Sequence, residues 1–369
     1  MPSTDFAIDD AVWQRLAEFR APETLGFGLV QAPVMFSATY ADGRWTRGEL
    51  LPYGPIEILP GARALHFAEQ IFEGLKAYRV GRPTANLFRA RDNYQRFCRS
   101  AERIAMLPVP EELFYTGIHA VVGACTALIP DRTGRSLYVR PFLFGTEPGY
   151  AVRASTTARF MVIANPSEAF AAGPISVLIE RTQVRAARGG VGFAKTGANY
   201  AASLLASTEA VRRGYTIPLW LDPTTRENIE ELSGMNLFAV IKGELHTPVL
   251  NDSILAGVTR DSLITLSRDA GWKVVERTIP IAELSELIMG GDCSEVFACG
   301  TAAIVAPVSV IAETDGREYR LAVQDERAQI LRERLLSIQE RRAPDPYGWT
   351  TDVTPILHVA GHTVRAGGR

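Results

Sequence analysis

The chain has 369 residues, of which 47% are hydrophobic and 22% charged, a composition typical of a globular protein long enough for two domains with separate cores. Its 39 basic and 41 acidic residues give a net charge of -2 without a long run of either sign, which argues against a nucleic-acid or anionic-membrane partner. The N-terminus lacks the basic and apolar regions of a signal peptide, and no uncharged apolar run reaches membrane-spanning length.

The cysteines and histidines suggest neither a disulfide framework nor a metal site. Four cysteines are too few and too unevenly spaced for either a disulfide scaffold or a zinc knuckle, so reduced thiols in a cytoplasmic compartment are expected. The five histidines form no pair at the helical spacing of metal ligands, and we expect no metal.

Helix and strand patterns divide the chain into two halves. The first half predicts a helix at 11–19, strands within 27–45, two buried segments within 62–80 that turn at Glu73-Gly74, helices at 92–106 and 111–128, and strands at 136–145 and 160–164. A linker-like segment at 166–174 predicts domains at 1–165 and 175–369. The second half predicts strands at 175–180 and 217–221, a helix at 198–213, a hairpin at 239–250, a helix ending at Gly271, a strand pair at 295–310 and a helix at 325–341.

The strand expected at 136–145 carries an arginine on one face. Alternation of side chains places Leu137 and Val139 on one face and Tyr138 and Arg140 on the other. A guanidinium on a buried strand face needs an anion, which could be a structural carboxylate or a carboxylate of the substrate. The residues alone leave both alternatives open.

Residues 189–200 hold a single lysine, Lys195, among four glycines. A lysine that is held by a shaped backbone and partly desolvated can lose its proton and condense with a carbonyl group. The ordinary alternative is a solvated glycine-rich turn, which the stretch by itself does not exclude.

Two later segments are candidates for binding anions. Residues 255–261 are expected to open a helix with Thr259 as its N-cap, and the backbone N–H groups and dipole at such a start favour a phosphate. A capped helix without a ligand has the same pattern. Gly300-Thr301-Ala302, between two expected strands, could offer a hydroxyl and backbone donors to a second anion.

Seven ordered motifs together resemble the branched-chain amino acid aminotransferases, fold type IV enzymes of the class IV aminotransferase family that use pyridoxal 5'-phosphate. The resemblance covers about residues 27–310. Its motifs are Phe72-Glu73-Gly74-Leu75-Lys76-Ala77-Tyr78, Leu87-Phe88-Arg89, Leu137-Tyr138-Val139-Arg140-Pro141, Lys195-Thr196-Gly197-Ala198-Asn199-Tyr200, Glu231 with Ser233-Gly234-Met235-Asn236-Leu237-Phe238, 255–261, and Gly300-Thr301-Ala302. It implies an α/β (α+β) fold of two domains, a smaller N-terminal α/β domain and a larger C-terminal domain with a barrel-like β core, with the cofactor at the domain interface.

The resemblance also implies how the cofactor is bound. Lys195 would form the Schiff base with pyridoxal phosphate and move the proton between the substrate Cα and the cofactor. Glu231 would keep the pyridine nitrogen protonated, so that the ring acts as an electron sink, and Tyr200 would hydrogen-bond the ring oxygen. The remaining implied contacts are with the phosphate, through Arg89, Val258, Thr259 and Thr301, and with the face of the ring, through Leu255.

The implied substrate residues lie mostly in the first half. Tyr138 and Arg140 match positions of the substrate site, where the arginine receives the distal carboxylate of glutamate, so that aliphatic and acidic side chains can be accepted in turn. The turn at Thr301 and Ala302 would bind the α-carboxylate. The other matching positions are two wall residues, Phe27 and Phe67, and two residues of a loop that reaches the site of a second subunit, Tyr150 and Val152. A homodimer is therefore implied.

Three departures from the family pattern affect these expectations. Phe67 stands where the animal enzymes have a tyrosine, which removes a hydroxyl from the wall of the site. Ala303 and Ala306 occupy the positions of the redox Cys-x-x-Cys pair of mammalian members, so no thiol switch of that kind is expected. Tyr150 is bulkier than the leucine common at its position.

The function implied is reversible transamination between L-leucine, L-isoleucine or L-valine and 2-oxoglutarate. Within the same fold, the alternatives are a D-amino acid aminotransferase, a 4-amino-4-deoxychorismate lyase, and a transaminase of aromatic or modified amino acids in a specialised pathway. A cofactor-binding protein without catalysis is the alternative of a different class. Lys195 and Glu231, the two residues that the chemistry most needs, argue against it.

Overall fold

The structure is a computed structural model that describes residues 6–168, 173–321, 326–359 and 362–365. Its chain forms two compact units. The first comprises Met1–Ala169, Lys195–Gly197 and Ser337–Arg369, and the second comprises Phe170–Ala194 and Ala198–Leu336. The lysine expected to react therefore belongs to the first unit together with the C-terminal segment, and the domain limits expected from the sequence stay predictions.

The first unit is built on a ten-stranded sheet with the main order β1-β4-β2-β9-β8-β6-β7-β19, in which β3 pairs with β2 and β5 with β8. All its pairs are antiparallel except β1 with β4. The strands are β1 (Ala7–Ile8), β2 (Val34–Ala41), β3 (Arg44–Trp45), β4 (Glu49–Pro52), β5 (Gln70–Phe72), β6 (Leu75–Tyr78), β7 (Ala85–Phe88), β8 (Ser136–Gly145), β9 (Ala158–Ser167) and β19 (Thr350–Val353). A separate hairpin joins β20 (Ile356–Val359) to β21 (His362–Arg365).

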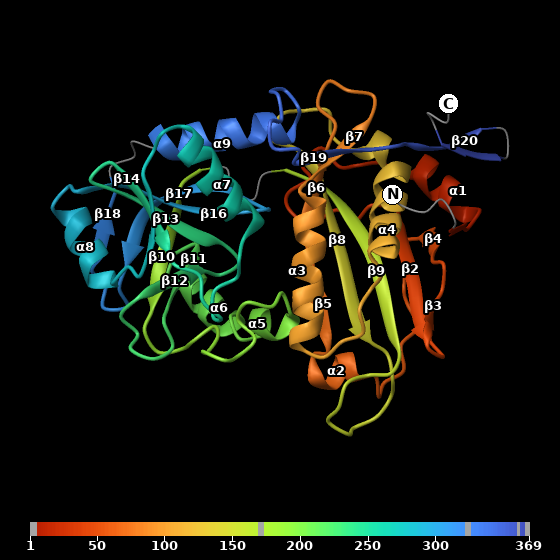
Figure 1. Cartoon of the computed structure of the whole chain (residues 1–369), viewed down its shortest axis with the longest axis horizontal. Helices are drawn as coiled ribbons and strands as arrows, with labels where there is room; N and C mark the ends of the chain where they lie inside the picture. The colour runs from red at the N-terminus through yellow and green to blue at the C-terminus, as the bar shows by residue number, and fades with distance from the viewer. Residues whose placement is uncertain (1–5, 169–172, 322–325, 360–361, 366–369) are drawn as a thin grey trace. The chain divides into compact units, whose positions relative to one another are not determined.

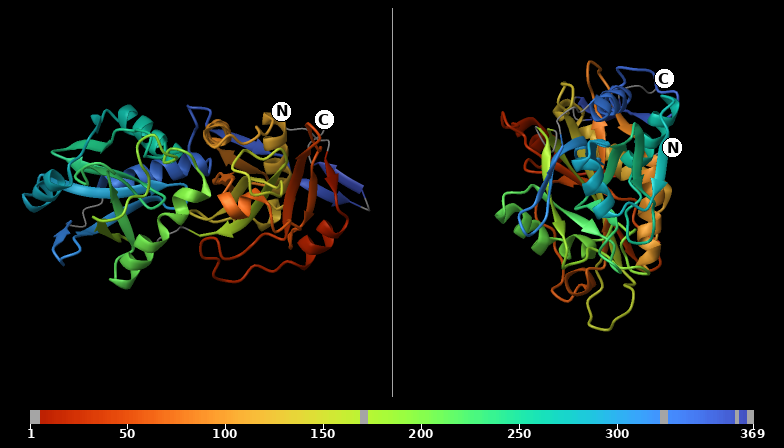
Figure 2. Two further views of the ribbon diagram at one scale, coloured as in Figure 1. Left: turned by 90° about the horizontal axis from the view of Figure 1, so that it is seen from below. Right: turned by 90° about the vertical axis from the view of Figure 1, so that its left-hand side faces the viewer.

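Helices cover one face of this sheet. They are α1 (Ala11–Glu18), α3 (Ala90–Arg103) and α4 (Glu111–Ala124), and a short 3-10 turn, η1 (Thr126–Leu128), follows α4. The short helix α2 (Arg63–Phe67) lies on the opposite face, where its Ala64 packs against the cluster that includes Phe144. Figure 1 shows α3 and α4 against the sheet, and Phe97 and Phe114 from these helices pack with Phe160 of β9 in the main core. Burying each phenylalanine contributes about 1.5–3 kcal/mol. α1 packs on β4 at the β1 edge of the sheet (Figure 2).

The opposite face of the same sheet carries the side chains of β8 that alternate with the core residues, including those of Tyr138 and Arg140. Along β8, Leu137, Val139 and Leu143 enter the main core, whereas Phe142 and Phe144 belong to a second cluster on the other face. The alternation predicted for 136–145 is confirmed. The turn predicted at Glu73-Gly74 is wrong, because β5 and β6 follow one another along β8 in a single antiparallel register, with Phe72 opposite Phe142 and Leu75 opposite Val139.

The C-terminal segment completes the first unit. β19 pairs antiparallel with β7, with Thr351 opposite Leu87. The Tyr78 hydroxyl donates to Gln339 Oε1 at 2.9 Å, and Asn86 Nδ2 donates to the carbonyl of Gln339 at 2.8 Å. Two buried polar groups of the N-terminal strands therefore take their partners from the far end of the chain.

The second unit is built on a nine-stranded sheet with the main order β12-β11-β10-β17-β16-β13-β14-β15, in which β18 pairs with β17. β12, at one end of this order, also contacts β13 and β14 near the other end, so the sheet is curled. The strands are β10 (Ile175–Glu180), β11 (Ile217–Leu221), β12 (Ile229–Leu232), β13 (Asn236–Ile241), β14 (Glu244–Pro248), β15 (Val274–Arg277), β16 (Cys293–Gly300), β17 (Ile304–Ala312) and β18 (Glu318–Arg320). The helices that lie within this unit are α6 (Leu204–Arg212), α7 (Val258–Asp269) and α8 (Ile281–Met289). Two further helices lie mostly in it: α5 (Gly197–Ala201), whose first residue belongs to the first unit, and α9 (Glu326–Gln339), whose residues from Ser337 belong to the first unit.

Two helix predictions in the second half are wrong. The helix expected at 198–213 is divided into α5 and α6, because the chain tightens at Ser203, whose N–H donates to the carbonyl of Tyr200. The N-cap of α7 is Gly257 and not Thr259, since Gly257 has an extended backbone and its carbonyl accepts the first helical bond, from Asp261. A β-carbon at Gly257 would lie 2.1 Å from Asn236 Oδ1, so only glycine fits there.

Among the residues that the structure describes, none of the helices combines the length and apolarity needed to cross a bilayer.

Candidate active site

Lys195 is held by its backbone against the edge of the first unit's sheet. Its N–H donates to the Ser100 hydroxyl at 2.9 Å, and its carbonyl accepts from the N–H of Phe72 at 3.0 Å. The next residue, Thr196, bridges to Ile71 and donates its hydroxyl to the carbonyl of Gln70 at 2.7 Å. A segment distant in sequence thus pairs with β5, which fixes the position from which the lysine side chain starts.

The lysine side chain and the arginine of β8 contact one aromatic ring. Lys195 Nζ lies 5.1 Å from the centre of the Phe72 ring, and the Arg140 guanidinium carbon lies 4.6 Å from it. Arg140 also donates to the Tyr138 hydroxyl at 3.1 Å, and the Tyr138 ring meets Phe27 edge-on with centres 5.0 Å apart. The first unit therefore brings together four of the predicted site residues.

In the part of the chain that the structure describes, no carboxylate pairs with Arg140. Among the described residues its partners are the Tyr138 hydroxyl and two aromatic rings, and its buried Nε has no hydrogen-bond partner. A half-buried guanidinium with an unsatisfied donor is suited to a bound carboxylate. The substrate carboxylate, the second alternative that the sequence left open, stays a prediction.

A buried ion pair lies beside Phe72 in the sequence and the structure. Arg96 of α3 contacts the Glu73 carboxylate through two hydrogen bonds, of 2.7 and 2.8 Å, and both side chains are buried. One turn later, Ser100 donates to the carbonyl of Arg96 while accepting from Lys195. Gly74 must be glycine, since a β-carbon there would lie 1.9 Å from the Tyr138 hydroxyl oxygen.

Arg89 lies at the start of α3 and has a left-handed backbone, with φ of 50°. Its guanidinium contacts both carboxylate oxygens of Asp92, at 3.0 and 2.8 Å, and lies 5.1 Å from the ring of Trp349. These contacts hold the side chain of the predicted phosphate ligand in one orientation.

The second unit holds Glu231 in a buried polar cluster. Arg185 contacts Glu231 Oε1 at 2.8 Å, and both side chains are almost fully buried. The other carboxylate oxygen accepts from Asn236 Nδ2 at 3.2 Å and from the N–H of Leu255 at 3.3 Å. Arg185 also donates to the carbonyls of Gly192 and Ser253, so one guanidinium orients the carboxylate and two loops.

A second glutamate, Glu230, lies beside this cluster. Burial raises its pKa, while a hydrogen bond from the Ser253 hydroxyl and the charge of Arg185 oppose the increase.

The two predicted anion-binding segments of the second unit lie near this cluster. Asn236 donates to the carbonyl of Leu255 at 3.0 Å, just before α7 begins at Val258, and Thr259 is buried in the first turn. Asn236 also pairs with Cys299 of β16, which leads directly into the turn of Thr301 and Ala302. The second unit therefore gathers Glu231, Leu255 and these two segments around Asn236.

The remaining predicted residues occupy other places. Tyr200 is half-buried in α5. Phe67 ends α2, and Tyr150 and Val152 lie in the loop between β8 and β9 with their side chains mostly exposed. The described contacts do not bring these last three residues to the Phe72 ring.

Several residues of the site were not predicted from the sequence: Phe72 as a ring contact, Ser100, Arg96, Arg185 and Asn236. Phe72 and Asn236 stand inside motifs that the sequence analysis quoted, so proximity to a motif was an available signal for them. Ser100 and Arg96 act across long sequence separations and offered no local signal.

Comparisons with known proteins show the family to which the chain belongs. Residues 70–311 match the family model described as amino-transferase class IV. A branched-chain-amino-acid aminotransferase of Mycobacterium tuberculosis (strain ATCC 25618 / H37Rv) is 42% identical over 347 residues, covering 91% of this chain and 93% of the relative.

Solved structures show the same fold. The branched-chain aminotransferase of Thermoproteus uzoniensis, solved with norvaline, has a TM-score of 0.70 and 27% identity and covers 86% of this chain and 99% of its own. A branched-chain amino acid aminotransferase from T.th., complexed with N-(5'-phosphopyridoxyl)-L-glutamate, has a TM-score of 0.70 and 28% identity and covers 87% and 99%.

Fold and sequence together define a fold type IV protein of mixed α/β class. The chain belongs to the class IV aminotransferase family. The family and fold class predicted from the sequence are confirmed.

Proposed function

We propose that this protein is a branched-chain amino acid transaminase that moves the amino group reversibly between L-leucine, L-isoleucine or L-valine and 2-oxoglutarate, with pyridoxal 5'-phosphate as cofactor. The observation that carries the proposal is that Lys195 and Arg140 contact the same aromatic ring. Lys195 supplies an amine that can react, and Arg140 supplies a cation with an unsatisfied donor that can bind a carboxylate. The relative of Mycobacterium tuberculosis, which is named for this activity, supports the choice of substrate.

The residues present fit the cofactor. The cluster around Glu231 offers a buried carboxylate that Arg185 orients, as a pyridine nitrogen requires, and the start of α7 is shaped by an obligatory glycine. Such a helix start favours a phosphate through its dipole. When bound, the cofactor supplies an electron sink for negative charge at the substrate Cα.

Each residue then has a defined task in the proposal. Lys195 holds the cofactor through its side-chain nitrogen and accepts and returns the proton of the substrate Cα. Glu231 holds the proton on the pyridine nitrogen, and Tyr200 donates to the ring oxygen. The other proposed cofactor contacts are Leu255 on the ring face and Arg89, Val258, Thr259 and Thr301 at the phosphate.

Arg140 would solve the problem of binding two unlike side chains. With glutamate bound, its guanidinium receives the distal carboxylate in a charge-assisted contact. With leucine bound, it keeps its contacts to the Tyr138 hydroxyl and the Phe72 ring, so the charge is not left without partners. Phe27 and Phe67 would line the apolar wall, and Thr301 and Ala302 would receive the α-carboxylate.

We also propose a homodimer in which Tyr150 and Val152 of one subunit approach the substrate site of the other. Their side chains are 75% and 89% exposed in the single chain, so both are available to a second copy. A cytoplasmic location is proposed because the four cysteines are free thiols.

The test is a visible absorption spectrum followed by a panel of amino donors. We expect the purified protein with pyridoxal phosphate to show a visible cofactor band and to transfer amino groups from L-leucine to 2-oxoglutarate. Lys195→Ala should lose both, whereas Lys242→Ala, which removes an exposed lysine at a turn, should keep both. A band that survives unchanged in Lys195→Ala, or activity with D-amino acids alone, would contradict the proposal.

A further inference from the structure

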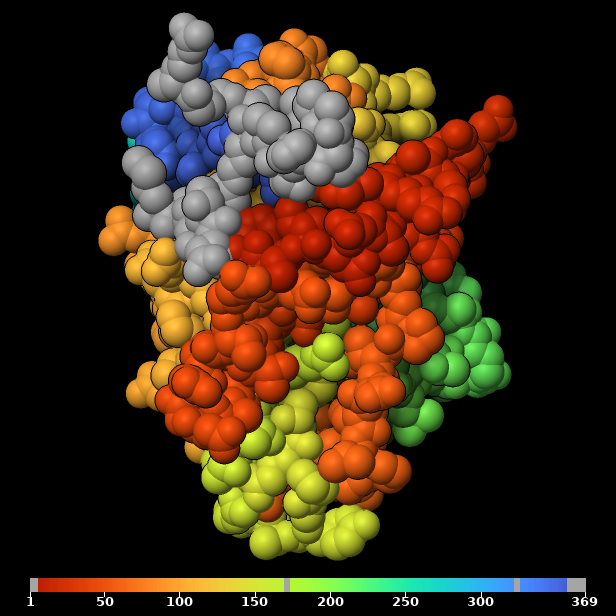
Figure 3. Space-filling model, turned by 90° about the vertical axis from the view of Figure 1, so that its right-hand side faces the viewer, coloured from red at the N-terminus to blue at the C-terminus, as the bar shows by residue number. Residues whose placement is uncertain are grey.

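The loop at 146–157, which connects β8 to β9, presents its two large apolar side chains to solvent. Tyr150 and Val152 are 75% and 89% exposed. Figure 3 shows the loop, in yellow-green, projecting at the lower end of the face in view. A loop of this kind would ordinarily be mobile, because exposed residues provide few contacts to order it.

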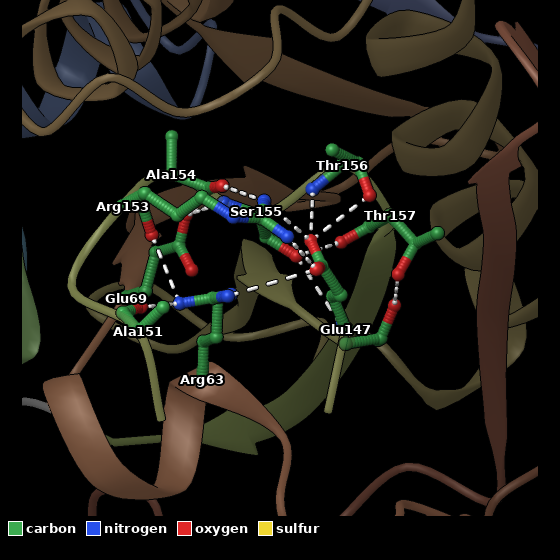
Figure 4. A network of polar contacts seen from close by, with 10 residues as sticks. Arg63, Glu69, Glu147, Ala151, Arg153, Ala154, Ser155, Thr156 and Thr157 are labelled. Atoms are coloured by element: carbon green, nitrogen blue, oxygen red, sulfur yellow. Dashed lines mark hydrogen bonds and ion pairs between the residues drawn. The ribbon is translucent and has the colours of Figure 1, made fainter. Parts of the chain in front are cut away.

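A buried arginine holds this loop from inside. Arg63, the first residue of α2, is only 1% exposed. Figure 4 shows its guanidinium enclosed by the loop, where it donates to the carbonyls of Ala151 and Arg153 and lies 3.6 Å from the Glu147 carboxylate. Its backbone N–H donates to the carbonyl of Glu147 at 3.2 Å. The planar guanidinium thus ties both ends of the segment 147–153 to α2.

The two carbonyls that Arg63 binds lie on either side of Val152, because Ala151 precedes it and Arg153 follows it. Ala151 also directly follows Tyr150, so Arg63 fixes the backbone beside both exposed apolar side chains. His66, one turn after Arg63, supports Tyr150 with an edge-on ring contact at 5.3 Å.

Two glutamates secure the second half of the loop. Glu147 accepts from the N–H and hydroxyl of Thr156, at 2.7 and 2.9 Å, and from Arg153. These contacts, the Thr156 N–H first, lower the pKa of Glu147 to about 2, so it is ionised at neutral pH. Glu69 accepts from the N–H of Ser155 at 2.8 Å, and the Ser155 hydroxyl in turn accepts from the N–H of Glu147 at 3.2 Å.

We propose that Arg63 is a positioning residue for transamination. It fixes the 146–157 loop in the conformation that presents Tyr150 and Val152 to the substrate site of a second copy of this chain. The inference rests on the proposed homodimeric transaminase. It adds that the shape of one subunit's substrate site depends on a buried cation in the other subunit.

The first experiment measures the loop directly. Hydrogen exchange of the backbone amides at 147–157 should be faster in Arg63→Ala than in the wild type, and Arg63→Lys should lie between them, because an ammonium cannot reach all the acceptors at once. The matched control is Arg317→Ala, which removes an exposed arginine paired with the neighbouring Asp315. Exchange in Arg63→Ala at the wild-type rate would overturn the positioning role.

The second experiment measures the consequence for the substrate. The KM for L-leucine should rise by about tenfold in Arg63→Ala, while kcat and the concentration of pyridoxal phosphate needed for half-saturation change little. Arg63→Lys should restore part of the KM. A change confined to thermal stability, with KM unaffected in both variants, would show a structural role alone and would contradict the proposal.

Hybrid dimers decide whether the loop acts on the partner. In a hybrid of Arg63→Ala with Lys195→Ala subunits, the only reactive lysine faces an intact loop, so the KM for leucine should return to near the wild-type value. In a second hybrid, one subunit carries both Arg63→Ala and Lys195→Ala and the other is wild type. The reactive lysine of the wild-type subunit then faces the altered loop of the double variant, and the KM should stay raised. The opposite pattern would overturn the action on the second subunit.

Failure of the proposed function gives a different result. It would appear as a wild-type protein without leucine transamination, and in that case the hydrogen-exchange comparison still tests whether Arg63 positions the loop.

Discussion

The ammonium of Lys195 and the guanidinium of Arg140 contact the same Phe72 ring, at 5.1 and 4.6 Å from its centre. The negative face of an aromatic ring attracts a cation, so Phe72 stabilises two like charges that would otherwise repel each other. The ring therefore links the group proposed to react with the group proposed to recognise the substrate's far end.

This relationship predicts different losses for the two half-reactions in Arg140→Ala. The glutamate half-reaction should lose about 10²-fold or more in kcat/KM, because the distal carboxylate loses its cation, whereas the leucine half-reaction should lose less than about tenfold. Single-turnover absorbance measurements of each half-reaction would separate them. Equal losses would contradict the role of Arg140 as the carboxylate receptor.

A second prediction concerns the ion pair of Arg185 and Glu231. Arg185→Ala would leave a buried carboxylate without its cation and two loop carbonyls without their donor, so we expect a loss of about 3 kcal/mol or more in the free energy of unfolding. Adding Glu231→Gln to this variant should recover part of the loss, because the buried charge is removed. Urea denaturation of the two single variants and the double variant gives the coupling, and strictly additive losses would show that the pair is not coupled.

The four cysteines should differ sharply in reactivity. Burial raises the pKa of Cys125, Cys293 and Cys299 to about 12, so almost none of these thiols is ionised near pH 8, whereas Cys98 is only half-buried. A thiol reagent should therefore modify one cysteine in the native protein and all four in denaturant. Cys98→Ser should abolish the native reaction, and rapid modification of a second thiol would contradict the assigned burial.

Glu69 provides a prediction about pH. Burial raises its pKa above 4.5, although the Ser155 N–H and the charges of Arg63 and Arg153 oppose the increase and Glu147 adds to it. The folded protein therefore holds this proton at a higher pH than the unfolded chain. Its stabilising contribution is complete below about pH 4.5 and is lost as the pH rises through the raised pKa.

Glu69→Gln keeps an oxygen that can accept from Ser155 but does not titrate. The free energy of unfolding of the wild type, relative to this variant, should fall as the pH rises from about 4 to 7. Urea titrations at several pH values would measure it, and a relative stability that increases with pH would show that burial is not the dominant effect on Glu69.

The sequence predicted best the features that are encoded by neighbouring residues. The alternation along β8 needs only a period of two, so it could be read locally. The turn at Glu73-Gly74 was predicted wrongly, because pairing with the distant strand β8 on both sides of these residues keeps the chain extended. The N-cap of α7 was predicted wrongly because Thr259 is a good capping residue by itself. Gly257 is required there by Asn236, which belongs to a different strand.

Two residues that the sequence analysis missed bind partners far away in the chain. Ser100 precedes Lys195 by 95 positions, and Arg63 precedes the carbonyl of Ala151 by 88. The local pattern of a helix does not show whether a serine, such as Ser100, binds the backbone of a distant site residue. An arginine beside apolar residues also has no local signature of burial, because its acceptors are carbonyl groups that any sequence would provide.

The pairing of β19 with β7 has a consequence for the order in which the protein matures during synthesis. A ribosome that has released the chain only to residue 336 would expose the β7 edge, with the Tyr78 hydroxyl and the Asn86 amide lacking Gln339. The first unit, most of which is synthesised first, can therefore complete its folding only after the C-terminal segment is synthesised. N-terminal domains usually fold before the rest of the chain. We expect a fragment that ends at residue 336 to be cleaved by proteases within the first unit. Adding the peptide 337–365 should protect the fragment. Resistance of the fragment alone would show that the N-terminal strands are stable without the C-terminal segment.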